Sequence, residues 1–204
     1  MAGCKEFSPT VELIYMSAQP VPRLTPEQYL EIDRAAEVKS EYYDGEMFAM
    51  SGGRAPHAII SFALGAALIP ALRGRRCIVT GSDLRVRASE GGPFFYPDVS
   101  VCCGEMQLAD DNKDTLLNPI VIFEVLSPSS EAYDRGKKFA AYRRIDSLRE
   151  YVLVSQTEPS VESYLRGSDD KWTLTEFTGT DAICSLKSIE CQIALSDVYR
   201  DVPA

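Results

Sequence analysis

The strongest constraint in this sequence is one acid inside an apolar run. Residues 119–126 are PIVIFEVL, and Glu124 is the only charged residue among them. An apolar run of this length, rich in Val and Ile, is typical of a central strand covered on both faces. A buried charge without a partner costs several kcal/mol or more. Glu124 is therefore predicted to be a metal ligand or, alternatively, one half of a buried ion pair with Arg85 or Arg87.

A second acid stands at the start of another predicted strand. Pro97 and Asp98 directly precede the apolar residues 99–103, although proline and a bare carboxylate both weaken a strand. If this strand neighbours the one in 119–126, the two carboxylates converge on one point. Hard divalent cations such as Mg²⁺ and Mn²⁺ bind oxygen ligands, and such an ion would neutralise both charges. The alternative for Asp98 is a turn residue that caps the strand.

A lysine on the next predicted helix completes this group. Within residues 130–145, Asp134, Lys138 and Tyr142 repeat at i, i+4 and i+8 and so share one helix face. The helix packs back against the sheet soon after the apolar strand, so Lys138 is expected to approach the acids. An ordinary exposed lysine is the alternative, with Lys137 as the second candidate. A carboxylate pair, a metal and a lysine are the parts needed to hydrolyse a phosphodiester.

The chain predicts one α/β domain in residues 23–204, after an extended lead-in over residues 1–22. The expected elements begin with a helix in 24–37, a hairpin in 39–53 and a helix over about 55–73. Four strands follow, two of them in 76–81 and 83–88 (together about 76–87) and the others over about 98–102 and 119–126. The remaining elements are a helix over about 130–145, a strand over about 149–155, strands in 160–166, 171–177 and 190–195, and a closing helical turn in 195–201.

Local signals support several of these elements. Thr25, Pro26 and Gln28 form the capping-box pattern of a helix start, and Asp44-Gly45 is typical of a two-residue hairpin turn. In that hairpin Glu41 would lie opposite Phe48, with Glu46 on the same face.

Other local signals concern the two later helices. The helix over 55–73 is apolar nearly all round, so it is expected to be largely buried, with Pro70 shortening or kinking its end. Serines at 127, 129 and 130 are expected to cap the helix that follows them.

Composition excludes few functions. The formal net charge of −9 argues against non-specific coating of nucleic acid, but it allows a nuclease with an acidic metal site. Neither a membrane span nor a signal peptide is predicted, so a cytoplasmic location is expected. The cysteines lack zinc-site spacing and are expected to be small buried hydrophobes in a reducing compartment; they are Cys4, Cys77, Cys102, Cys103, Cys184 and Cys191.

The motifs YYDGEMFAMSGG…H, GSDLRV, YPDVSV, EVLSPSSEAYDRGKKFAAYRRI and REYVLV, in this order, resemble the Uma-two family of proposed restriction endonucleases, within the PD-(D/E)XK nuclease superfamily. The resemblance covers about residues 25 to 200. It implies a DNA-cleaving αβββαβ core, with an added N-terminal helix and hairpin and extra C-terminal strands. It further implies that Asp98, Glu124 and the Val125 carbonyl bind the metal. The superfamily pattern would place the lysine at position 126, where this chain has Leu126, and the family resemblance places it at Lys138.

The leading hypothesis is a Mg²⁺- or Mn²⁺-dependent endonuclease that acts on DNA. Nuclease folds of this kind often pair, so a homodimer is one expectation that the resemblance allows. The alternative is a catalytically silent nuclease-like fold that serves as a binding or regulatory module, and a third reading is an assembly protein with a structural metal. Four further residues could border the site, each with an ordinary explanation. Glu41 and Glu46 could face solvent, Asp83 could cap a turn, and His57 could serve the helix terminus or packing.

Overall fold

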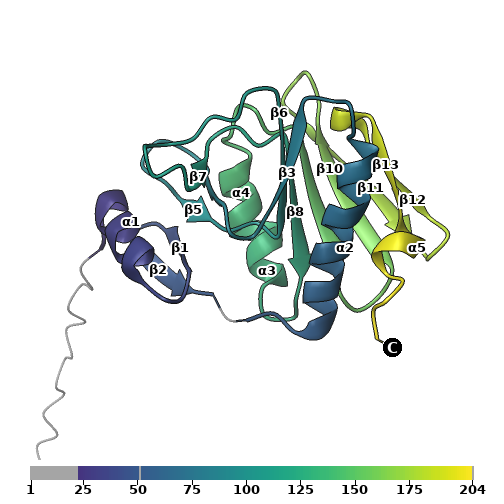
Figure 1. Ribbon diagram of the computed structural model, residues 1–204, viewed down its shortest axis with the longest axis horizontal. Coiled ribbons are helices and arrows are strands. Elements are labelled where there is room, and N and C mark those ends of the chain that lie inside the picture. The colour runs from purple at the N-terminus through teal and green to yellow at the C-terminus, as the bar shows by residue number, and fades with distance from the viewer. Residues whose placement is uncertain (1–22, 51, 204) are drawn as a thin grey trace, which may run out of the picture.

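A mixed six-stranded sheet forms the centre of the fold in this computed structural model, which describes residues 23–50 and 52–203 (Figure 1). The strand order is β11 (Trp172–Thr178), β10 (Ser160–Arg166), β9 (Glu150–Ser155), β8 (Val121–Leu126), β6 (Val99–Cys103) and β3 (Cys77–Gly81). β8 and β9 are parallel, and the other neighbours are antiparallel. All six residues of β8 are buried, which confirms the predicted central strand. The predicted lead-in over residues 1–22 lies outside the described residues.

The two faces of β8 carry different cores. Val121, Phe123 and Val125 pack with Ile60 and Leu64 of helix α2 (Ala55–Ala71). The same side is completed by β12 (Ile183–Leu186), the 3-10 turn η2 (Lys187–Ile189), β13 (Cys191–Ala194) and α5 (Leu195–Val198).

The opposite face of β8 packs against the segment that follows it. Ile122 and Leu126 contact the core around helix α4 (Phe139–Tyr142), together with residues of a second, smaller sheet. Side chains alternate across a strand, so Glu124 points to this second side.

The segment after β8 differs from the predicted continuous helix over 130–145. It consists of α3 (Glu131–Tyr133), the π-helical turn η1 (Asp134–Lys138) and α4. Gly136 lies inside the wide turn, where its low helix propensity weakens the competing α-helix. Ser130 occupies the N-cap position without capping the helix by its side chain, and instead it exchanges hydrogen bonds with Ser127. π-turns are frequently found at functional sites.

The N-terminal part forms a second layer beside α3 and α4 (Figure 1). Helix α1 (Pro26–Ala35) begins with the predicted capping box. The hairpin of β1 (Ser40–Tyr43) and β2 (Glu46–Ala49) has the predicted register, with Glu41 opposite Phe48. These strands belong to a five-stranded sheet that also contains β4 (Arg85–Arg87), β5 (Phe94–Phe95) and β7 (Thr115–Leu116), in the order β2–β1–β5–β4–β7.

The burial expected for helix α2 was wrong, and three short strands were missed. α2 is not largely buried, because Phe62 is 80% and Ile69 59% exposed on its outer side. The helix ends at Ala71, one residue after Pro70, as expected from the missing N–H. The two strands predicted within 76–87 are confirmed as β3 and β4, which lie in different sheets. The short strands β5, β7 and β12 were not predicted.

The cysteines also depart from expectation, because Cys77 and Cys103 form a disulfide. These two residues are directly opposite each other in the β3–β6 register, which sequence spacing alone does not reveal. Cys102 faces the other side of the sheet, as predicted, and is free and buried like Cys184 and Cys191. Within the part of the chain that the structure describes, no helix has the length and apolar character to cross a bilayer.

Candidate active site

Strand pairing brings the two predicted acids together. β6 pairs with β8 so that Val99 lies opposite Phe123, and one further step of this register places Asp98 opposite Glu124. Asp98 Oδ2 accepts a hydrogen bond of 2.7 Å from the Val125 backbone N–H. This contact explains the position of the acid, since it satisfies a backbone donor at the edge where the β6 pairing ends. Both acids line one cleft of about 620 Å³.

Lys138 lies at the base of the same cleft, among three carboxylates. Its Nζ is 2.8 Å from Glu41 Oε1, 3.1 Å from Glu124 Oε1 and 3.5 Å from Asp134 Oδ1. All four side chains are buried. The Tyr142 hydroxyl donates to Glu124 Oε1 at 2.9 Å. The predicted face of Asp134, Lys138 and Tyr142 is therefore formed, although a π-turn rather than an α-helix carries its first part.

Burial and charge act in opposite directions on this group. Burial raises the pKa of Glu124 well above its ordinary value, although Lys138 opposes the effect. Burial likewise raises the pKa of Asp134. For Lys138, burial disfavours the ammonium, but Glu124, Glu41 and Asp134 together outweigh it and raise its pKa. The lysine is therefore a protonated amine near neutral pH, and the cleft still carries an excess of acids over amines.

His57 borders the acids as well. It lies in the first turn of α2, and its Nε2 is 3.3 Å from Asp98 Oδ2. The hydrogen bond with Asp98 raises the pKa of His57, against the opposing effect of burial. Gly53 approaches closely, because a Cβ at that position would lie 2.9 Å from His57 Nδ1. A helix-terminus or packing role was the first explanation for His57, and the structure adds a contact with Asp98.

Of the other residues that the sequence offered as candidates for the site, some line the cleft and others lie outside it. Glu41 is inside the cleft, whereas Glu46 is exposed on β2 and is not among the residues that line the cleft. The Asp83 side chain is almost fully exposed and pairs with Lys39 at 2.7 Å. Lys137 lines the cleft, with its amine over the Tyr43 ring at 5.5 Å. Of the two candidate lysines, only Lys138 contacts an acid of the site within the described residues.

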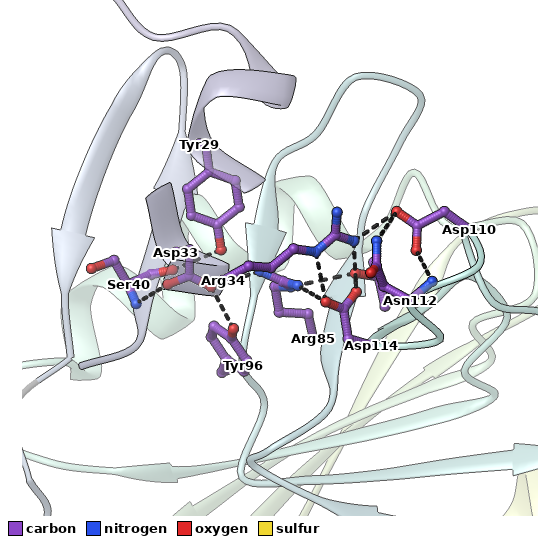
Figure 2. Close-up of polar contacts among 10 residues, drawn as sticks. Tyr29, Asp33, Arg34, Ser40, Arg85, Tyr96, Asp110, Asn112 and Asp114 are labelled. Atoms are coloured by element: carbon purple, nitrogen blue, oxygen red, sulfur yellow. Dashed lines mark hydrogen bonds and ion pairs between the residues drawn. The ribbon is translucent and has the colours of Figure 1, made fainter. Parts of the chain in front are cut away.

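Arg85 is not the partner of Glu124, nor is it free to contact phosphates. Figure 2 shows it in a separate polar cluster between α1, β4 and the loop before β7. Its Nη1 lies 2.6 Å from Asp33 Oδ2, and its Nη2 binds Asp114. Both ends of the Arg85–Asp33 pair are buried, so this arginine neutralises a buried acid of α1. The sequence could not distinguish this acid from Glu124 as its partner.

The same cluster fixes two segments that lead into the cleft. Asp33 accepts a hydrogen bond of 2.7 Å from the Ser40 backbone N–H and one of 2.6 Å from the Tyr96 hydroxyl. Ser40 directly precedes Glu41, and Tyr96 lies two residues before Asp98. The Tyr96 N–H in turn donates to Glu41 Oε1 at 3.2 Å. The buried acid of α1 therefore helps to fix the two segments that carry Glu41 and Asp98.

The outer part of this cluster gives a prediction for pH dependence. Hydrogen bonding to Arg34 lowers the pKa of Asp114 from 3.8 to about 2. A lowered native pKa stabilises the fold above pH 4, and this contribution is lost as the pH falls toward 2. Asp114→Asn is therefore expected to cost about 1–2 kcal/mol at pH 6 and much less at pH 2.5. Urea unfolding of both proteins at several pH values measures the difference; a cost that stays constant with pH would contradict the prediction.

The chemistry of the cleft fits a divalent cation with few protein ligands. Asp134 Oδ1 is buried and accepts no hydrogen bond among the residues that the structure describes, although Lys138 Nζ lies 3.5 Å away. Carboxylate oxygens and a strand carbonyl are ligands that Mg²⁺ and Mn²⁺ prefer. In residues 23–50 and 52–203, however, no three His, Cys, Asp or Glu side chains are close enough to form a metal-binding group. Any ion here would use two carboxylates, backbone oxygen and water rather than a side-chain cage.

Comparison with known proteins agrees with this fold. Two proteins from Synechocystis are each 36% identical to the chain and are described as uncharacterized: slr1290 over 92% of this chain and 97% of its own length, and sll1609 over 78% and 90%. A crystal structure described as a "putative nuclease" from Anabaena variabilis shares the fold with a TM-score of 0.72. It is 18% identical and covers 87% of this chain and 98% of that chain.

A family comparison extends over nearly all of the described chain. The model of the Uma2 family, described as "Putative restriction endonuclease", matches residues 26–196. This span includes the hairpin, the strands that carry Asp98 and Glu124, the π-turn with Lys138, and the C-terminal strands. The resemblance found in the motifs is thereby confirmed, and the chain belongs to the Uma2 (Uma-two) family.

Proposed function

We propose that this protein is a metal-dependent endonuclease that hydrolyses DNA phosphodiester bonds in the cleft between β6, β8 and η1. The observation that carries the proposal is the convergence of Asp98, Glu124 and Lys138 on one cleft from three separate elements. A protein with a purely structural role would gain nothing from several acids in its core, because burying a charge costs folding free energy. Family membership supports a nuclease, and DNA is the substrate that the family description implies.

The order of elements around the cleft also supports this proposal. α2, β3, β6, β8, the α3–η1–α4 segment and β9 follow one another in the sequence αβββαβ if the inserted second sheet is left aside. Asp98 then directly precedes the second strand of that core, and Glu124 lies on the third. The lysine comes from the helical segment, and Leu126, at the position of the superfamily lysine, is buried in the core beside α4.

The proposed metal ligands follow from the family resemblance, and the roles of Tyr142 and Lys138 follow from their contacts. Asp98, Glu124 and the Val125 carbonyl would hold the cation. The Tyr142 hydroxyl orients Glu124 through its hydrogen bond. Lys138 is protonated, so it is suited to bind a phosphate oxygen, orient a water or donate a proton to the leaving oxygen, rather than to act as a base. A divalent cation, when bound, supplies Lewis-acid chemistry that lowers the pKa of a water and offsets charge developing on the phosphate.

The direct test uses supercoiled plasmid with Mg²⁺ or Mn²⁺. The purified protein is expected to nick or linearise the plasmid, and excess EDTA is expected to stop the reaction. A protein that binds DNA without cutting it under any of these conditions would instead be the silent nuclease-like module, and the proposed activity would be wrong. Sedimentation of the same sample tests the predicted homodimer.

The metal site has an independent test in calorimetry. Glu124→Gln removes a proposed ligand but preserves size and an oxygen acceptor for Tyr142. Loss of a residue that only orients a ligand typically weakens metal binding by 10–100-fold, so loss of a ligand itself is expected to weaken Mn²⁺ binding by at least about 100-fold. Glu46→Gln on β2 is the matched control and should bind as the wild type does. Equal affinity in both variants would remove Glu124 from the metal site.

A further inference from the structure

The N-terminal hairpin contributes a buried carboxylate that the proposed metal site does not use. We propose that Glu41 is a positioning residue, which keeps Lys138 in the cleft when Glu124 engages a cation. This inference rests on the proposed function and assigns the β1–β2 hairpin a part in it. Glu41 and Glu124, which come from different sheets, would then both pair with Lys138. Glu41 would pair with it permanently, and Glu124 only in the absence of a cation.

The contacts of the amine suggest this division. Lys138 Nζ is closer to Glu41 Oε1, at 2.8 Å, than to Glu124 Oε1, at 3.1 Å. Asp134 is the third neighbour at 3.5 Å, which is beyond a good charged hydrogen bond. Glu41 is therefore the acid nearest to the amine, as an ion pair, while Glu124 also accepts a hydrogen bond from it.

Glu124 is the partner that a cation would take away. Its Oε1 already accepts hydrogen bonds from both Lys138 and Tyr142. A divalent cation at Glu124 would compete with the ammonium for the same carboxylate and would repel it by charge. Without another firm anchor, the lysine would leave the cleft when the cation entered.

Glu41 has the fixed position that an anchor needs. Its side chain is 8% exposed, and the same Oε1 accepts the Tyr96 backbone N–H. Its own strand is held at the preceding residue by the hydrogen bond from the Ser40 N–H to Asp33. Phe48 lies opposite in the hairpin and also lines the cleft. The carboxylate therefore remains in place whether or not Glu124 changes partners.

Amine labelling with and without metal tests this role. Wild type and Glu41→Gln are treated briefly with an amine-reactive ester, with or without saturating Mn²⁺, and labelling of Lys138 is measured by peptide mass spectrometry. Lys171, whose side chain is 83% exposed, serves as the internal reference. Lys138 of the wild type should stay protected in both conditions. In Glu41→Gln it should be protected without Mn²⁺, and its labelling should rise about tenfold with Mn²⁺, because the amine then lacks both Glu41 and Glu124 as partners.

Control variants separate positioning from other roles. Glu46→Gln, on the same face of the hairpin, should behave as wild type. Glu41→Asp keeps the charge on a shorter side chain, so it should show a smaller Mn²⁺-dependent rise and keeps the test valid if Glu41→Gln folds poorly. For plasmid cleavage at saturating Mn²⁺, Glu41→Gln should lower kcat with little change in KM.

Distinct results would overturn the inference. If Mn²⁺ does not change the labelling of Lys138 in Glu41→Gln and Glu41→Asp, the anchoring role is refuted, although the proposed metal site is not. Calorimetry that shows at least about 100-fold weaker Mn²⁺ binding in Glu41→Gln would make Glu41 a ligand instead. A wild type that binds no Mn²⁺ would refute the proposed function together with the inference.

Discussion

Asp98→Asn is expected to lower metal-dependent plasmid cleavage by at least about 100-fold while the protein remains folded. The Asn side-chain oxygen can still accept the hydrogen bond from the Val125 N–H, which Asp98 now accepts at 2.7 Å. The structural contact therefore survives, and the lost negative charge is what the experiment isolates. Initial cleavage rates at saturating Mg²⁺ measure the effect, and circular dichroism checks the fold.

The matched control is Asp83→Asn, which changes an exposed acid paired with Lys39 outside the cleft. It should cleave at the wild-type rate. Cleavage by Asp98→Asn within threefold of the wild type, or nicking by every variant alike, would contradict the assignment of Asp98 and point to a contaminating nuclease.

Arg85→Met is expected to produce the largest loss of stability, about 3–5 kcal/mol. The Arg85 side chain is 2% exposed and its partner Asp33 1% exposed, so the variant leaves a buried carboxylate without its cation. Methionine replaces most of the aliphatic volume, which limits the contribution of a cavity. Urea unfolding monitored by fluorescence measures the difference in free energy of unfolding.

Two further variants identify the cause of that loss. Arg34→Met removes another partner of Asp114, but its side chain is 27% exposed, so a cost of about 1 kcal/mol or less is expected. Adding Asp33→Asn to Arg85→Met should recover part of the stability, because the uncompensated charge is gone. An Arg85→Met protein within 1 kcal/mol of wild type would show that the buried pair contributes little.

The sequence predicted those parts of the fold that have strong local signals. The capping box of Thr25 and Gln28 placed the start of α1, and Asp44-Gly45 fixed the hairpin register. The apolar run around Glu124 identified β8 as central. In each case, neighbouring residues alone determine the local conformation.

Features that depend on distant partners were not predictable in the same way. The disulfide of Cys77 and Cys103 requires knowledge of strand register across 26 residues. β5 and β7 have two residues each, which is too short for any periodicity to be detected. The outer face of α2 is as apolar as its inner face, so composition could not show that Phe62 is exposed.

The candidate site was predicted in part. Asp98, Glu124 and Lys138 were singled out because each has an unusual place in a local pattern, and the structure brings them to one cleft. Glu41 was considered, but an alternating hairpin explained it equally well. Its burial follows from the packing of the hairpin against η1, which connects segments almost 100 residues apart in the chain.

The π-turn at Asp134–Lys138 makes the lysine's location depend on one surplus residue in a single helical turn. If this turn had ordinary α-helical spacing, the residues that follow it would be rotated about the helix axis by about 100° relative to the residues that precede it. The Lys138 ammonium would then no longer lie beside Glu41 and Glu124, although the strands that carry these two acids would keep their positions. The proposed grouping of Asp98, Glu124 and Lys138 therefore depends on the winding of this turn as well as on the pairing of the strands.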